Sequence, residues 1–91
     1  MSESKPIIVV SEPLSERALS FLAEHGELRR VTAEEAPSAV GAADALVVRT
    51  YTHVNHALLD AAPTLKVVGR AGVALDNIDI PACRARGVEV V

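Results

Sequence analysis

The sequence has 91 residues and a formal net charge of −3. A chain of this length forms one domain and buries roughly 60–70% of the surface that its unfolded form exposes, which excludes a two-domain enzyme with a cleft between domains. The acidic balance argues against a nucleic-acid partner, which would select a basic face. The single cysteine, Cys83, excludes an internal disulfide and a zinc cluster. No segment approaches the ~20 apolar residues of a membrane span, so we expect a cytoplasmic protein with no membrane partner.

The first third of the chain predicts a flexible tail over residues 1–4, then a strand, a helix and an edge strand. Four consecutive β-branched residues over 7–10 show no polar alternation, which is typical of a parallel strand covered on both faces. A helical repeat follows and predicts one buried stripe, with Gly26 as the stop. The stripe consists of Leu14, Ala18, Phe21 and Leu22. The polar stretch over 27–32 predicts a strand at a sheet edge.

The rest of the chain alternates strands with short helices. Apolar runs predict strands over 45–49, 66–69 and 88–91. Capping signals predict the helices between them. Thr32 and Glu35 have the spacing of a capping box, and Asn55 precedes the next helix. Asp79 precedes the last helix, which Gly87 ends.

Strands that alternate with helices imply a parallel sheet with right-handed crossovers and helices on both faces. Five strands in this length fit a flavodoxin-like, three-layer α/β/α fold with the strand order 2-1-3-4-5. Residues 5–91 would then make up one folded unit.

Polar residues follow three strands that such a sheet brings to one edge. Ser11 and Glu12 follow the first strand, residues 49–53 the third and residues 69–72 the fourth. Ligands of these sheets bind beyond the carboxyl ends of the strands, near the switch in strand order. Arginine offers a planar fork for carboxylate or phosphate, and glycine lets backbone approach a ligand closely. The pattern predicts a site for a small anion at Arg49, Thr50, Thr52, Arg70 and Gly72.

The same residues allow other roles. Arg49 also fits a solvated loop residue, and Arg70 fits an ion pair with Asp76 or Asp79 that holds its own loop. Asp76, Asn77 and Asp79 read as turn and capping residues. The three histidines, His25, His53 and His56, are expected on the surface. The sequence contains no G-x-G-x-x-G fingerprint, no P-loop and no nucleophile elbow, so we expect this chain to bind no cofactor or metal by itself.

Two stretches resemble a known family. LKVVGRAGVALDNIDIPACRARGVEVV, residues 65–91, resembles the N-terminal substrate-binding segment of the NAD-dependent D-2-hydroxyacid dehydrogenases. In that family a strand runs into G-R-A-G-x-G-x-D-N-[IV]-D, and a helix follows that ends in R-G-[IV]. The preceding ADALVVRTYTHV resembles the family's A-D-A-[LI]-[LI]-V-R-S-x-T-x-V. The nearest branch is that of the phosphoglycerate dehydrogenases, although Ala74 stands where the family usually has glycine and His53 where this branch often has lysine.

The resemblance implies roles for individual residues. Arg49 and Thr50 match the arginine and hydroxyl residue that hold the substrate, including its phosphate end. The loop after the fourth strand would hold the substrate carboxylate through backbone amides, and Arg70 would order that loop. The matching loop residues are Ala71, Gly72 and Val73.

The resemblance also implies the reaction of a parent enzyme. NAD would take hydride from a small anionic 2-hydroxy acid and leave a 2-oxo acid, as in the oxidation of 3-phosphoglycerate to 3-phosphohydroxypyruvate in serine biosynthesis. The NAD-binding Rossmann domain and the catalytic residues are expected beyond Val91, so the isolated chain is expected to be inactive. The alternative is a stand-alone flavodoxin-like binding or interaction module. A receiver domain fits poorly, because Arg49 and Thr50 stand where it needs an aspartate. Exposed apolar surface would favour a homo-oligomer.

Overall fold

The predicted alternation of strands and helices is confirmed by a computed structural model, which describes residues 5–71 and 76–91. The strands are β1 (Ile7–Val10), β2 (Glu27–Arg30), β3 (Ala45–Val48), β4 (Val67–Arg70) and β5 (Glu89–Val90). The helices are α1 (Glu16–His25), α2 (Ala36–Ala39), α3 (His56–Asp60) and α4 (Ile80–Ala85). None of these helices is long and apolar enough to cross a membrane.

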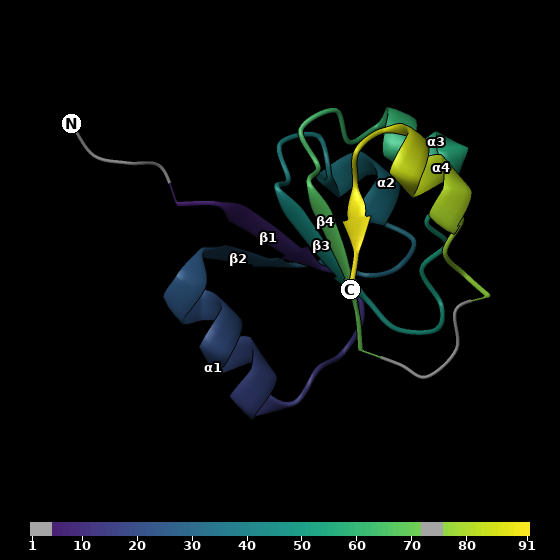
Figure 1. Ribbon diagram of the computed structural model, residues 1–91. Coiled ribbons are helices and arrows are strands. Elements are labelled where there is room, and N and C mark those ends of the chain that lie inside the picture. Colours follow the sequence, from purple (N-terminus) through teal and green to yellow (C-terminus); the bar gives the residue numbers. More distant parts are fainter. Residues whose placement is uncertain (1–4, 72–75) are drawn as a thin grey trace.

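All strand pairs are parallel, and their order is β2-β1-β3-β4-β5, as predicted. α1 covers one face of the sheet, and α2, α3 and α4 gather on the other (Figure 1). The register pairs Val10 with Val47 and Val48 with Arg70. The carboxyl ends of β1, β3 and β4 therefore lie side by side, which places the segments after these strands at one edge.

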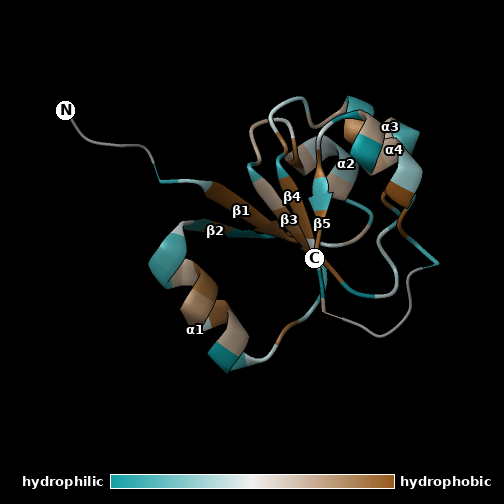
Figure 2. Ribbon diagram, in the orientation of Figure 1, coloured by the Kyte–Doolittle hydropathy of each residue, from teal (hydrophilic) through white to brown (hydrophobic). Residues whose placement is uncertain are grey.

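The two faces of the sheet differ in how well they are covered. On the face of α2, α3 and α4, Leu46, Val48 and Val68 are fully buried in one apolar cluster. On the other face, Ala45 and Val47 of β3 stay half-buried. The hydrophobic strands are visible as a brown layer between the helices (Figure 2). Most of the core stability thus comes from the first face.

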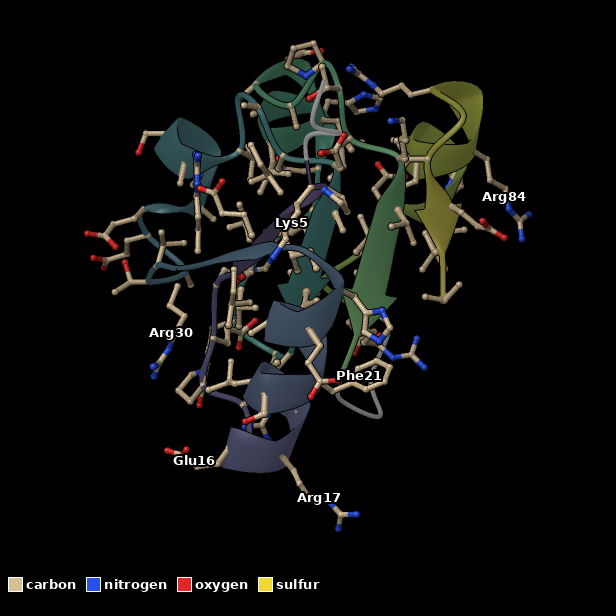
Figure 3. The ribbon with its side chains drawn as sticks, turned by 90° about the vertical axis from the view of Figure 1, so that its left-hand side faces the viewer. Lys5, Glu16, Arg17, Phe21, Arg30 and Arg84 are labelled. Carbon is tan, nitrogen blue, oxygen red and sulfur yellow. The ribbon has the colours of Figure 1, made fainter. Side chains whose placement is uncertain are left out.

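α1 packs against the edge strand β2 on the other side of the sheet and has no buried residue. Leu14, Ala18 and Leu22 of the predicted stripe are half-buried. The prediction for Phe21 was wrong: 60% of this residue is exposed, and its ring stands out from α1 (Figure 3). Its described ring neighbour is His25, at a centroid distance of 4.5 Å. The predicted helix is confirmed, but Phe21 lies at the solvent-exposed edge of the predicted apolar stripe.

The caps predicted at Asn55 and Asp79 are formed, whereas the pair at Thr32 and Glu35 encloses a turn before α2. The N–H of Thr32 donates to Glu35 Oε1 at 2.9 Å and the N–H of Glu35 to Thr32 Oγ1 at 3.1 Å, the reciprocal bonds of a capping box, but α2 begins after Glu35, whose side chain does not cap it. Asn55 accepts from Leu58 N–H, and Asp79 accepts from Ala82 N–H. The three histidines are exposed as expected. One of them, His56, has an acidic neighbour that the sequence did not suggest, Asp79, at 3.8 Å.

Gly26 joins α1 to β2 at a point where its backbone lies close to the backbone of Pro6. Its φ of −174° is extended and open to any residue, so the constraint is space alone. A Cβ at this position would lie 2.5 Å from the carbonyl oxygen of Pro6 and 2.8 Å from Ile8 Cδ1. The glycine therefore lets β2 begin directly beside β1.

We predict that Gly26→Ala lowers the free energy of unfolding by about 1–3 kcal/mol, because the Pro6 backbone must move to admit the methyl group. Urea denaturation of the purified chain measures the change. Gly41→Ala is the matched control, since its Cβ would meet no atom closer than 4.0 Å. Equal stability of the two variants would contradict this account of Gly26.

Candidate functional site

The segment after β3 is held by one buried carboxylate. Glu12, which follows β1 and is 6% exposed, accepts four consecutive backbone N–H groups. Its Oε2 accepts from Arg49 at 2.6 Å and Thr52 at 3.0 Å, and its Oε1 accepts from Thr50 at 2.9 Å and Tyr51 at 2.8 Å. We call residues 49–52 the β3 loop. Glu12 thus fixes the loop that carries Arg49, Thr50 and Thr52 of the predicted site.

Two opposing effects set the pKa of Glu12. Burial alone would raise the pKa, because it removes water from the charged form. The N–H donors of Tyr51, Arg49 and Thr52 together outweigh burial, so the pKa lies below its ordinary value of 4.5. Glu12 is therefore a carboxylate at neutral pH, and its charge is balanced by backbone dipoles.

The carbonyl groups of the β3 loop have a partner of their own. Asn77 Nδ2 donates to the carbonyl oxygens of Arg49 at 2.8 Å and Thr52 at 2.7 Å. Asn77 is buried, and its own carbonyl accepts from Val54 N–H at 2.8 Å. The sequence predicted Asn77 as a turn residue, and no sequence signal indicated this longer contact. Asn77 links the segment before α4 to the β3 loop.

Thr52 faces inward. It is 1% exposed, and its hydroxyl lies 2.6 Å from that of Ser11, which also donates to the Val47 carbonyl at 3.5 Å. Its hydroxyl, its N–H and its carbonyl therefore all have internal partners. A ligand contact for Thr52 stays a prediction, and within the described contacts this residue anchors the loop to β1.

Arg49 and Thr50 face outward on the same loop. Both are exposed. The Arg49 guanidinium donates through Nη1 to the carbonyl oxygen of Pro13 at 3.2 Å, which draws the side chain toward the β1 side. Among the described residues this carbonyl is the one partner of the guanidinium, whose other N–H groups could bind an anion. The exposed Tyr51 stands next to them, on a hollow of about 560 Å³ between the ends of β1 and β2.

Arg70 and Ala71 end β4 at the same edge. Arg70 is half-buried and lines a hollow of about 510 Å³ with Arg84 on the β5 side. Arg49 and Arg70 thus share an edge by strand register, while their described neighbours lie on different sides of it. The N–H of Ala71 donates to the Val48 carbonyl at 2.8 Å. Gly72 and Val73 lie outside the described residues, so the predicted amide site of this loop stays a prediction.

Comparison with known proteins decides the family. The family model of the D-isomer specific 2-hydroxyacid dehydrogenase catalytic domain matches residues 8–91. The chain belongs to this family. It is 43% identical over 89 residues to D-3-phosphoglycerate dehydrogenase of Mycobacterium leprae, and 44% identical over 87 residues to that of Methanocaldococcus jannaschii. These matches cover 94% and 92% of the chain, but only 17% of each relative.

Solved structures agree with the fold. A protein from Pyrococcus horikoshii superposes with a TM-score of 0.87 at 26% identity and covers 93% of this chain and 26% of its own. The NAD⁺-bound 3-phosphoglycerate dehydrogenase of Entamoeba histolytica gives a TM-score of 0.79 at 26% identity, with 97% of this chain and 32% of that chain covered. The family resemblance and the strand order predicted from the sequence are thereby confirmed.

We predict that the stability advantage of the native chain over Glu12→Gln depends on pH. Because folding lowers the pKa of Glu12, its stabilisation is fully present above the ordinary value of 4.5 and is lost as the pH falls through the folded-state pKa. At pH 7 we expect Glu12→Gln to cost about 1–3 kcal/mol, since the amide replaces a charged acceptor of buried N–H groups. Urea denaturation of both proteins between pH 7 and pH 3 measures the difference; a gap that stays constant would refute the claim.

A second prediction concerns Asn77. Asn77→Asp replaces the donating amide with a carboxylate that faces two carbonyl oxygens, and should cost about 1–3 kcal/mol at pH 7. Asn55→Asp is the matched control, because an N-cap accepts aspartate as well as asparagine. Thermal unfolding followed by circular dichroism compares them. If both variants melt together, the two Asn77 bonds contribute nothing measurable.

Proposed function

We propose that residues 5–91 are the substrate-binding part of an NAD(P)-dependent 2-hydroxyacid dehydrogenase that oxidises 3-phosphoglycerate. The observation that carries the proposal is the β3 loop, whose four N–H groups are bound by Glu12 and two of whose carbonyls are bound by Asn77, while Arg49 and Thr50 face outward. It is supported by the names of the relatives, D-3-phosphoglycerate dehydrogenase in bacteria and archaea. A relative named hydroxypyruvate reductase, from Thermotoga maritima, is 36% identical over 87 residues.

In this proposal the chain binds and orients the acid. The planar fork of Arg49 holds a phosphate or carboxylate through paired N–H donors, and Thr50 adds a hydroxyl beside it. The loop that begins at Ala71 would hold the other acidic end. Fixing the substrate in one orientation lowers the entropy that the reaction must lose, which is the part of catalysis that a binding segment supplies.

The cofactor would be held elsewhere in the parent enzyme. NAD(P) supplies the hydride acceptor of the reaction when it is bound. The two glycines of Gly-Arg-Ala-Gly do not form a dinucleotide fingerprint, and α4 that follows has six residues. These features do not fit dinucleotide binding by this chain. We therefore propose that the chain alone binds substrate without oxidising it. In this proposal a homo-oligomer is formed by the parent enzyme.

Titration of the ¹⁵N-labelled chain with 3-phosphoglycerate tests the proposal. We expect the amide signals of the β3 loop and of Arg70 and Ala71 to move first. Arg49→Ala should weaken binding by roughly tenfold or more, because a charged hydrogen bond contributes about 1.5–3 kcal/mol. The shifts plotted against ligand concentration give the dissociation constant.

Arg17→Ala is the matched control for the lost positive charge. Arg17 is exposed on α1 and points away from the rest of the molecule (Figure 3). This variant should bind like the native chain. Equal weakening in both variants would mean that only net charge matters and would refute a specific site. Formation of NADH by the chain with NAD and 3-phosphoglycerate would refute the division between binding and turnover.

A further inference from the structure

The β3 loop has the form of an anion-binding site whose anion belongs to the chain itself. Four successive N–H groups converge on one carboxylate, at distances of 2.6 to 3.0 Å. Runs of backbone N–H groups that converge in this way make concave sites for phosphate and other anions in many proteins. Here Glu12 reaches the loop from 37 residues away in sequence and fills the concavity.

A substrate anion therefore meets side chains rather than amides at this loop. The N–H groups of the loop donate to Glu12, and the carbonyls of Arg49 and Thr52 accept from Asn77. What remains on the outer side is the side chains of Arg49, Thr50 and Tyr51, which are exposed. The direction in which these side chains leave the backbone depends on the loop conformation that the carboxylate imposes.

We propose that Glu12 is a positioning residue, which acts as an internal anion and holds Arg49 and Thr50 in the orientation that receives the acid. The part that concerns the acid rests on the proposed function; the part that concerns the loop does not. Arg49 itself supports this arrangement, since its guanidinium donates to the carbonyl of Pro13, the residue after Glu12. The backbone N–H of Arg49 is thus bound by Glu12, and its guanidinium is bound by the next residue, Pro13.

The other charged groups near Glu12 do not replace it. Arg30 and Glu35 line the same hollow as Glu12. Glu35 is held by the N–H of Thr32 in the capping box. Arg30 projects outward from the end of β2 (Figure 3). Neither makes a described hydrogen bond to the β3 loop, which leaves Glu12 as the carboxylate that orders it within the described contacts.

Chemical rescue tests the proposal directly. Glu12→Ala removes the CH₂–COO⁻ group of the side chain, which has the size and charge of acetate. The variant leaves four inward N–H donors without their acceptor, and a small carboxylate from solution can take its place. We expect saturable recovery of the β3 loop amide signals toward their native positions as sodium acetate is added to the ¹⁵N-labelled variant, with sodium chloride at equal ionic strength as the reference.

Affinity for 3-phosphoglycerate separates positioning from a purely structural role of Glu12. If the role were purely structural, acetate would not change the affinity of Glu12→Ala for 3-phosphoglycerate. We expect Glu12→Ala to bind it at least fivefold more weakly than the native chain, and acetate to restore most of the loss. Glu35→Ala is the matched control, a carboxylate of the same hollow that also accepts a backbone N–H; it should show neither loss nor rescue. Glu12→Asp, which keeps the charge on a shorter chain, should retain more affinity than Glu12→Gln.

Each outcome has a separate meaning. If acetate and chloride shift the loop amides alike, the internal-anion role is refuted. If acetate restores the amides but leaves affinity for 3-phosphoglycerate unchanged, positioning is refuted and only loop order remains. If the native chain fails to bind 3-phosphoglycerate while acetate still rescues the loop, the proposed function fails and not the role of Glu12 in the loop. Should Glu12→Ala be unfolded, acetate-dependent refolding followed by circular dichroism replaces the amide readout, and its absence counts against the proposal.

Discussion

The Glu12 carboxylate and its four backbone N–H donors are the interaction on which the site depends. Turning a chain after a parallel strand leaves N–H groups with no strand to receive them, and buried donors without an acceptor are costly. One carboxylate at the end of β1 resolves this for the whole β3 loop. A charged acceptor also makes stronger bonds than a neutral one, so Glu12 holds the loop that carries the predicted site residues Arg49 and Thr50.

The same edge of the sheet is bound together in a second direction. Asn77 closes the carbonyl side of the β3 loop, and the Ala71 N–H donates to the Val48 carbonyl. The ends of β1, β3 and β4 are thus joined by bonds that run across the sheet edge, not only along the strands. Functional side chains are most accurately placed when a second layer of contacts locks their backbone. The strand order brings these segments to one edge of the sheet, and the polar contacts fix the backbone of the β3 loop there.

Much of the fold was readable from the sequence, because the signals were local. An unbroken β-branched run marked β1, apolar runs marked β3 and β4, and Asn55 and Asp79 marked helix starts by spacing alone. Phe21 was misplaced because periodicity gives the stripe of a helix but not how far neighbours cover it. The role of Glu12 was invisible for another reason: its partners are backbone N–H groups, which every residue type except proline presents alike. Asn77 was predicted as a turn residue, but its contacts were not, because its partners lie 25 and 28 residues earlier.

The contacts at this edge separate residues that hold the β3 loop from residues that face outward. The inward groups of the site, Glu12, Thr52 and Asn77, bond to backbone or to one another, so changing them alters the loop itself. Tyr51 and His53 are exposed, and no described side-chain hydrogen bond from either one holds the backbone, whereas the outward Arg49 donates to the Pro13 carbonyl. Substituting Tyr51 or His53 changes size and charge at this edge at little cost in stability. Family relatives named for 3-phosphoglycerate and for hydroxypyruvate retain this fold. Tyr51 and His53 are therefore the positions of this edge that can change while the bonds of Glu12, Thr52 and Asn77 keep the edge in place.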